Sequence, residues 1–224
     1  MQTSVSTPNA PEYCTVCHAR ALTLLEVISE VPYWRCNDCE ATMMDPHHWL
    51  SAAEEKAIYD LHDNNLDDPG YQRFLEKLMV PLVDRLPDEV HGLDFGCGPG
   101  PALAQMLCSE GMEVSLYDPV YQPATDVLER QFDFITCTEV AEHLHDPKAT
   151  FEQLDGLLKP GGWLGVMTCF QTDDTRFANW HYRRDPTHVV FYREATLARI
   201  AQAMGWTLEI PAKDVALFQK PQKV

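Results

Sequence analysis

The sequence predicts an α/β protein that carries a small metal-binding ribbon at its N-terminal end. Two observations support this prediction: strand and helix patterns alternate over residues 86–224, and two Cys-x-x-Cys pairs lie before residue 48. Alternation of this kind is typical of a sheet covered by helices. We therefore expect a zinc ribbon over residues 1–48, a helical cap or linker over residues 49–85, and an α/β domain over residues 86–224.

Charge restricts the kind of partner that the protein can bind. The 224 residues include 34 acidic and 17 basic side chains, which give a formal net charge of −17. Such a surface repels phosphate backbones, and proteins that bind nucleic acid normally carry a basic stripe. The one basic cluster, Arg183 and Arg184, is too short to form a stripe. The composition favours a small neutral or cationic partner over RNA or DNA.

The cellular compartment can also be predicted. No apolar run approaches the ~20 residues that a bilayer-spanning helix needs. Residues 1–12 are polar and lack the apolar segment of a secretory signal. We expect a cytoplasmic protein with no membrane partner, in which cysteines stay reduced, so the eight cysteines need an explanation other than disulfides.

Four cysteines have the spacing of a zinc ribbon. Cys14 and Cys17 form one pair, and Cys36 and Cys39 form the second after an interval of eighteen residues. A strand-like segment at 33–35 predicts the hairpin that brings the pairs together as a closed tetrahedral thiolate site. Zinc would supply folding energy that ~50 residues cannot obtain from their own core. No open coordination position remains, so we expect no catalysis there; a redox pair and ligation by His18 are the alternatives.

The middle part of the chain is predicted to be helical. An apolar stripe at helical spacing comprises Tyr71, Phe74, Leu75, Leu78 and Leu82. Pro81 is expected to kink or restart this helix. The acidic run over residues 63–70 is expected to be a solvated loop. Tyr71 and Phe74 either pack within the stripe or cover a bound cofactor.

The elements of the α/β domain follow from apolar runs and end signals. Asp146 and Pro147 have the residue types of a helix N-cap and first turn, and Gly205 is typical of a helix end. The last two strands are expected to form an antiparallel pair. Strands are predicted at 92–95, 114–117, 132–137, 163–168, 206–210 and 215–219, and helices at 101–109, from 147 onward and around 197–204.

A glycine-rich turn follows the first of these strands. The segment from Asp94 to Gly100 reads Asp-Phe-Gly-Cys-Gly-Pro-Gly and leads into a helix. Glycine is needed where the backbone turns sharply and approaches a ligand closely. Asp118 ends the next strand, about twenty residues later, where a carboxylate can accept both hydroxyl groups of a ribose. The pattern predicts a cofactor that contains a nucleoside.

These residues resemble the class I S-adenosylmethionine-dependent methyltransferases, whose first motif is D/E-x-G-x-G-x-G. Residues 132–144 and 158–163 look like the fourth strand of that family and the approach to the fifth. The resemblance covers roughly residues 90–210, and it implies a Rossmann-like doubly wound sheet. It also implies S-adenosylmethionine as the cofactor. The implied cofactor-binding residues are Asp94, Gly96, Cys97, Gly98 and Gly100 for the methionine end, Asp118 for the ribose, and the backbone around Cys137 and Thr138 for the sulfonium.

One departure from the family concerns residues 118–132. This interval is too short for an ordinary helix and third strand. We expect a loop around Pro119 and Pro123 in their place. The acid of the family that contacts adenine after the third strand is therefore not identifiable, and Asp126 is a poor candidate.

The acceptor side is expected after the fourth strand and in a later loop. Glu139, Glu142 and His143 are followed downstream by His188, within an aromatic and His-rich segment over residues 180–192. This constellation is similar to two metal-using groups, the small-RNA 3′-end 2′-O-methyltransferases and the ubiquinone-pathway O-methyltransferases. The resemblance implies a second divalent ion, Mg, Mn or Zn, at Glu139, Glu142, His143 and His188. The alternatives are a metal-free catalytic role for His143, His188 and Glu142, or purely structural hydrogen bonds.

The sequence predicts a methyltransferase that uses S-adenosylmethionine to methylate oxygen or nitrogen of a small-molecule acceptor. Two alternatives remain open. An RNA methyltransferase could use the ribbon to bind its substrate, although the net charge disfavours this. A non-catalytic scaffold could bind the cofactor and use the ribbon as a docking site for another protein.

Overall fold

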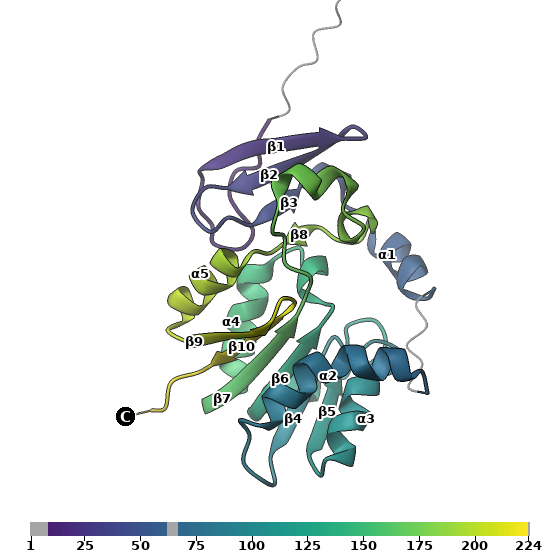
Figure 1. The fold of residues 1–224 in the computed structure, drawn as a ribbon, viewed down its shortest axis with the longest axis vertical. Helices are drawn as coiled ribbons and strands as arrows, with labels where there is room; N and C mark the ends of the chain where they lie inside the picture. Colours follow the sequence, from purple (N-terminus) through teal and green to yellow (C-terminus); the bar gives the residue numbers. More distant parts are fainter. Residues whose placement is uncertain (1–8, 62–66, 224) are drawn as a thin grey trace, which may run out of the picture.

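A computed structural model describes residues 9–61 and 67–223 of the chain (Figure 1). Two sheets follow one another along the long axis of the molecule: a four-stranded sheet at one end and a six-stranded sheet below it. Within the described residues, no helix combines the length and apolar character needed to cross a bilayer. The cytoplasmic location stays a prediction.

The six-stranded sheet has the strand order β5-β4-β6-β7-β10-β9. Its first four strands are parallel, and β10 runs antiparallel to both of its neighbours, as the expected C-terminal pair requires. β7 begins five residues earlier than predicted because Phe132 pairs with Leu158 across a register shift. The bounds are β4 His91–Phe95, β5 Glu113–Tyr117, β6 Phe132–Thr138, β7 Leu158–Met167, β9 Thr207–Ala212 and β10 Val215–Gln219.

Helices cover both faces of this sheet, which confirms the doubly wound α/β prediction. Alternate residues of β10 show the two faces: Val215 and Leu217 join one apolar cluster with α2 and α3, whereas Ala216 and Phe218 join the other with α4 and α5. The period-two alternation of a strand explains this division. The bounds are α1 Ala52–Tyr59, α2 Pro69–Val83, α3 Ala102–Ser109, α4 Pro147–Leu157 and α5 Glu194–Met204.

The interval between β5 and β6 lacks the helix and strand that such folds usually place there, as expected. It contains an isolated bridge between Asp118 and Gln122 and a short 3-10 helix, η2 (Thr125–Glu129). Within residues 9–61 and 67–223, β5 is consequently an edge of the sheet. The absence of that strand leaves the end of β5 and its following loop open to a neighbouring cavity.

In the middle segment, the expected loop was wrong at its end, and of the two alternatives at Pro81 the restart was wrong. Pro69 and Gly70 do not belong to a loop but begin α2, with Asp68 as an N-cap that accepts the Gly70 amide at 2.8 Å. Residues 63–66 of the predicted loop lie outside the described residues. α2 does not restart at Pro81, because proline removes one hydrogen bond near the helix end while the buried face of three leucines continues past it.

The four-stranded sheet combines the ribbon with a distant segment. β1 (Leu22–Ile28) and β2 (Val31–Cys36) form the expected hairpin, and β3 (Thr42–Met44) pairs with β2. The fourth strand, β8 (Val190–Phe191), comes from the chain just before α5 and pairs with β3. The ribbon cysteines share one apolar cluster with the α4–α5 face of the larger sheet. The division at residues 48 and 85 stays a prediction.

Candidate functional site

The four ribbon cysteines converge on one point. Their sulfur atoms lie within 4.8 Å of one another, with Cys14 Sγ 3.6 Å from Cys39 Sγ and Cys17 Sγ 3.5 Å from Cys36 Sγ. All four are free thiols. A hydrogen bond with Cys36 raises the pKa of Cys14 to about 12, and the same contact lowers the pKa of Cys36. A divalent cation would stabilise all four thiolates together, so the cluster fits zinc.

The two Cys-x-x-Cys turns have equivalent backbones. The first cysteine of each turn accepts an amide from the residue four positions later, His18 at 2.9 Å and Glu40 at 3.1 Å. Both of these residues have a positive φ, 58° for His18 and 61° for Glu40. His18 therefore serves the turn through its backbone, and within the described chain it is not part of the sulfur cluster.

A cavity of about 670 Å³ lies at the carboxyl ends of β4, β5 and β6. This is where open α/β sheets bind their ligands. Most of the sequence-predicted site residues line it, and α1 and α2 contribute to its wall. The lining includes Glu55, Tyr59, Tyr71, Phe74, Asp94, Gly96, Cys97, Gly98, Gly100, Asp118, Val120, Tyr121, Thr138, Glu139, Glu142, His143, His181, Tyr182, Asp185 and His188.

The glycine loop has the conformation that its residue types predict. Gly96 and Gly98 have φ values of 77° and 63°, which side chains disfavour. A Cβ atom on Gly96 would lie 2.4 Å from Cγ2 of Val140, in the segment after β6. Asp94 is buried and accepts a hydrogen bond from Oγ1 of Thr136 at 2.8 Å, and burial raises the pKa of its carboxyl to about 6.

Asp118 joins the glycine loop to the loop after β5. Its Oδ2 accepts the Gly98 amide at 3.0 Å, and its Oδ1 accepts the amides of Val120 and Tyr121 at 2.8 and 2.9 Å. A ribose at this wall would use the remaining lone pairs of the carboxylate. Thr138 lines the cavity, whereas the Cys137 side chain is fully buried in the apolar cluster shared with α4 and α5.

Glu142, His143 and His188 form a compact group. One ligand atom of each lies within 4.8 Å of the others, although His188 is 45 positions after His143. Glu142 follows β6 in a short 3-10 helix, η3 (Ala141–His143), and is 0% exposed. Neither of its carboxylate oxygens makes a hydrogen bond of good geometry; burial raises the pKa of this carboxyl, and the nearby Tyr182 and Thr168 side chains act in the opposite direction. A buried acid in this state needs a proton, a cation or a ligand.

Both histidines present the same nitrogen to the group. Nδ1 of His143 lies 3.1 Å from the Thr187 carbonyl oxygen, and Nδ1 of His188 lies 2.7 Å from the Tyr182 carbonyl oxygen. Because a carbonyl only accepts, each Nδ1 carries the proton, and each Nε2 is free of it in the neutral ring. Nε2 of His143 lies 3.7 Å from Oε1 of Glu142. Burial lowers the pKa of His188, which favours that neutral form.

Glu139 occupies a different part of the cavity wall. It directly follows β6 with a φ of 51°, and its amide donates to the Met167 carbonyl at 2.8 Å. Burial raises the pKa of Glu139 to about 9, with the nearby charge of Glu142 acting in the same direction. Within the described residues the potential metal-binding group contains Glu142, His143 and His188 but not Glu139, so the geometry brings together three of the four predicted ligands.

Several cavity residues escaped the sequence analysis. The ring of Tyr59 meets the His143 ring edge-on with centroids 5.3 Å apart, and the Tyr121 hydroxyl donates to Asp60 at 2.7 Å. Glu55 lies 2.9 Å from Nε2 of His145. These residues come from α1, which buries no side chain, and from an irregular loop. Neither segment carries a periodic signal that could have indicated a binding wall.

Comparisons with known proteins agree with this geometry. Residues 70–209 match a family model described as a methyltransferase domain. The chain is 35% identical over 135 residues to the ubiquinone biosynthesis O-methyltransferase of Xylella fastidiosa (strain M23), an alignment that covers 47% of this chain and 54% of that protein. The chain thus spans about half the length of the curated relatives it matches.

Two solved structures are similar in fold. An O-methyltransferase family protein from Burkholderia thailandensis superposes with a TM-score of 0.52 at 15% identity, over 76% of this chain and 64% of that one. The 1,6-didemethyltoxoflavin-N1-methyltransferase of the same organism, with its substrate and S-adenosylhomocysteine bound, gives a TM-score of 0.50 at 18% identity, over 88% and 98%. At these identities, both similarities concern the fold.

Proposed function

We propose that this chain, which belongs to the methyltransferase domain family and is an S-adenosylmethionine-dependent methyltransferase, methylates a hydroxyl group of a small aromatic molecule without negative charge. The observation that carries the proposal is the buried Glu142 carboxylate, which makes no hydrogen bond of good geometry and lies within 4.8 Å of a ring nitrogen of His143 and of His188. This group can receive a hydroxyl and its proton.

The cofactor half of the proposal is supported by the glycine loop. Asp94, Cys97 and the loop glycines Gly96, Gly98 and Gly100, all of which line the cavity, would hold the methionine end, and Asp118 would hold the ribose. The backbone around Cys137 and Thr138 would face the sulfonium. Gly96 and Gly98 have the positive φ values that allow the backbone to approach a ligand. The missing strand after β5 leaves Val120 and Tyr121 on the side where the adenine would lie.

The charge of the cavity supports an uncharged or cationic acceptor. Among its described lining residues, none is Lys or Arg, and six are acids: Glu55, Asp94, Asp118, Glu139, Glu142 and Asp185. A carboxylate or phosphate on the acceptor would find no Lys or Arg among these residues to pair with, and it would lie close to the acids that stay ionised. RNA is disfavoured for the same reason.

The shape and lining of the wall support an aromatic acceptor. The rings of Tyr59, Tyr71, Phe74, Tyr121 and Tyr182 all line the cavity. Stacked and edge-on contacts with such rings would hold a planar substrate in one orientation. Oxygen is the proposed target atom because the relatives with the higher identity are named O-methyltransferases.

The chain's own residues can then assist a direct displacement. The acceptor oxygen attacks the methyl carbon, the carbon–sulfur bond breaks, and the sulfonium becomes the neutral thioether of S-adenosylhomocysteine. His188 takes the proton of the hydroxyl at Nε2, and its hydrogen bond to the Tyr182 carbonyl keeps the ring in the required tautomer. His143 is oriented in the same way by Thr187.

Glu142, His143 and His188 also fit a divalent ion such as Mg, Mn or Zn. The buried carboxylate of Glu142 and the ring nitrogens of His143 and His188 converge as a mixed oxygen and imidazole donor set. A bound ion would lower the pKa of the acceptor hydroxyl and orient it. The ribbon cysteines would hold a separate structural zinc that takes no part in the reaction, because four thiolates leave no open coordination position.

The proposal is tested with three catechols of different charge. Formation of S-adenosylhomocysteine and methylated product is followed by mass spectrometry with methylcatechol, dopamine and protocatechuate, which are neutral, cationic and anionic. We expect kcat/KM for protocatechuate to be at least about tenfold below that for methylcatechol, on the scale of a close like-charge contact. Equal turnover of all three would remove the charge argument. Absence of S-adenosylhomocysteine binding in calorimetry would remove the cofactor site.

A further inference from the structure

The main chain of Val189 connects the ribbon to the acceptor side of the cavity. Its carbonyl accepts the amide of Met44 in β3 at 2.8 Å, and its own amide donates to the Glu142 carbonyl at 2.8 Å. His188 is the preceding residue, and β8 follows at Val190. The single residue Val189 therefore connects β3 of the ribbon to Glu142, and it directly follows His188 in the chain.

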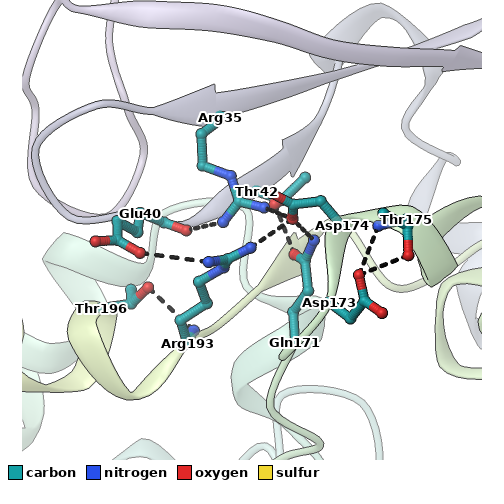
Figure 2. A network of polar contacts seen from close by, with 9 residues as sticks. All are labelled: Arg35, Glu40, Thr42, Gln171, Asp173, Asp174, Thr175, Arg193 and Thr196. Atoms are coloured by element: carbon teal, nitrogen blue, oxygen red, sulfur yellow. Dashed lines mark hydrogen bonds and ion pairs between the residues drawn. The ribbon is translucent and has the colours of Figure 1, made fainter.

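A polar network holds this junction closed (Figure 2). The Asp174 carboxylate receives Nη2 of Arg35, from β2, and Nη2 of Arg193, from the start of α5, each at 2.5 Å. Arg193 also contacts Glu40 at 3.4 Å, and Arg35 donates to the Glu40 carbonyl. Asp174 thus lies between two guanidinium groups that would otherwise repel each other, and it pairs with both.

A neutral contact lies beside these charges. Oγ1 of Thr42, in β3, donates to Oε1 of Gln171 at 2.7 Å, and both residues are at most 3% exposed. The backbone amide of Gln171 in turn donates to the backbone carbonyl of Tyr192 at 2.8 Å. Buried polar groups of this kind specify one arrangement, because any other leaves a donor or acceptor unsatisfied.

The segment over residues 171–193 also contacts β2 near the middle of the segment. Nη1 of Arg183 lies 3.3 Å from the Tyr33 hydroxyl, and its guanidinium lies over the Tyr33 ring. Tyr33 packs edge-on against Phe177 with centroids 5.1 Å apart. Tyr182, which directly precedes Arg183 in the chain, supplies the carbonyl that orients His188. Residues 171–193 are therefore attached to the ribbon at both ends and in between.

The ribbon side of these contacts depends on the cysteine cluster. Arg35 directly precedes Cys36 and Glu40 directly follows Cys39, and the Cys36 amide donates to the Ala41 carbonyl just before β3. A metal held by the four thiolates would fix these positions through the two Cys-x-x-Cys turns, in addition to the apolar cluster that the ribbon shares with the larger sheet. The glycine loop at Asp94–Gly100, by contrast, lies between β4 and α3, and its Gly96 and Gly98 amides donate to Tyr117 and Asp118 at the end of β5 in the larger sheet.

We propose that the cysteine-held ribbon is a positioning element of the acceptor pocket, and that Arg35, Asp174 and Arg193 are the positioning residues that couple it to His188 and Glu142. The inference rests on the proposed function in one respect, which is the assignment of His188 and Glu142 to the acceptor. Weakening the network therefore loosens residues 182–192 and reduces acceptor binding, while the cofactor site stays intact.

The test uses the full chain with its metal bound and compares Asp174→Asn with Asp173→Asn. The two residues are neighbours in one loop, but the Asp173 carboxylate contacts Thr175 and Arg176 rather than the ribbon. Asparagine keeps the cap at position 173 and removes the charge that pairs two arginines at position 174. Hydrogen exchange of residues 182–192, S-adenosylhomocysteine affinity by calorimetry, and KM for methylcatechol are measured for both variants.

For Asp174→Asn we expect faster exchange over residues 182–192 and a KM raised by roughly threefold to tenfold, the range typical of coupling through contacts remote from a ligand. S-adenosylhomocysteine affinity should stay unchanged, and Asp173→Asn should match the unsubstituted protein in all three measurements. Unchanged exchange and KM in Asp174→Asn would overturn the inference, as would an equal loss of cofactor affinity.

Removal of the metal by a chelator under reducing conditions provides a second arm. We expect faster exchange over residues 182–192 with S-adenosylhomocysteine binding retained; exchange unchanged by metal loss would contradict the inference. Failure of the proposed function gives a different pattern. The unsubstituted protein would then bind no S-adenosylhomocysteine or turn over no catechol, whereas the exchange comparison does not depend on either ligand.

Discussion

The two sides of the cavity are built in different ways. The cofactor side comes from one strand–turn–helix unit and the end of the adjacent strand, with Asp94, Gly96 and Gly98 within five positions of one another. The acceptor side combines residues 139–143, a loop 45 positions later and the ribbon that holds that loop. A local unit can be recognised by its motif, whereas an assembled site depends on the packing of distant segments. The two sides should therefore respond differently to substitution.

The largest effect on cofactor binding is expected where the two sides touch. Gly96→Ala places a methyl group 2.4 Å from the Val140 side chain and at a φ of 77°. Strain of this kind costs on the order of 1–3 kcal/mol, so S-adenosylhomocysteine affinity should fall by up to about a hundredfold. Because Val140 precedes the acceptor-side residues of η3, the KM for methylcatechol should rise as well. Both values are measured, by calorimetry and by initial rates.

Gly111→Ala is the matched control for this substitution. Gly111 also has a positive φ, 90°, but an added Cβ would have no heavy atom within 4 Å. It should lower the stability of the protein by about 1 kcal/mol and leave cofactor affinity unchanged. Equal losses of affinity in both variants would mean that backbone conformation matters and the contact with Val140 does not.

A change confined to the acceptor side should affect turnover alone. His188→Ala removes the proposed proton acceptor, so kcat should fall by about 100- to 1,000-fold, the usual contribution of a general base. S-adenosylhomocysteine affinity should stay within a factor of about two, since independent sites behave additively. His48→Ala, an exposed histidine away from the cavity, serves as the control. Loss of cofactor affinity in His188→Ala would show that the two sides are not separable.

The two sides should also differ in their dependence on pH. Burial raises the pKa of Asp94 to about 6, so Asp94 takes up a proton as the pH falls through that value, and S-adenosylhomocysteine affinity should decline. Burial lowers the pKa of His188, so its Nε2 stays available below the usual titration range of imidazole, and kcat should decline only at lower pH. Calorimetry and saturating-substrate rates across pH 5–8 separate the two, with pH 5–8 chosen as roughly the range in which histidine normally titrates. Asp94→Asn should abolish the decline in affinity near pH 6; a decline that persists would assign it to another group.

The smallest effect is expected at the rim of the cofactor side. Tyr121→Phe removes the 2.7 Å hydrogen bond between the Tyr121 hydroxyl and Asp60, which links the loop after β5 to the end of α1. An exposed bond of this type contributes about 0.5–1 kcal/mol, so S-adenosylhomocysteine affinity should fall by roughly two- to fivefold. Tyr13→Phe, at an exposed tyrosine of the ribbon, should have no effect. A larger loss would mean that α1 covers the bound cofactor.

The features that were predicted correctly from sequence each depend on residues that lie close together along the chain. The cysteine pairs, the glycine loop and the N-cap at Asp146 all depend on residues a few positions apart, and all three are found as expected. Pro81 does not divide α2 into two helices, because the burial of Leu78 and Leu82 outweighs one lost hydrogen bond. The period-two and helical patterns also sufficed for nearly every strand and helix of the larger sheet.

The remaining features involve segments too short or too irregular to carry a pattern. β8 contains two residues, and its pairing with β3 depends on the position of the ribbon relative to α5. Glu139 and Glu142 are three positions apart, yet only Glu142 joins the two histidines, because the left-handed backbone at Glu139 turns the chain between them. Tyr59 and Tyr121 reach the cavity from α1 and a loop without amphipathic character.

The sequence alone determined the sulfur cluster and the glycine turn after β4, because each needs particular residue types at fixed spacing within one local unit. Only the tertiary structure decided that Glu142, His143 and His188 meet and that β8 pairs with β3 of the ribbon. Those contacts join β3, η3 and β8 across the molecule. Their formation depends on how the two sheets pack, which no local spacing encodes.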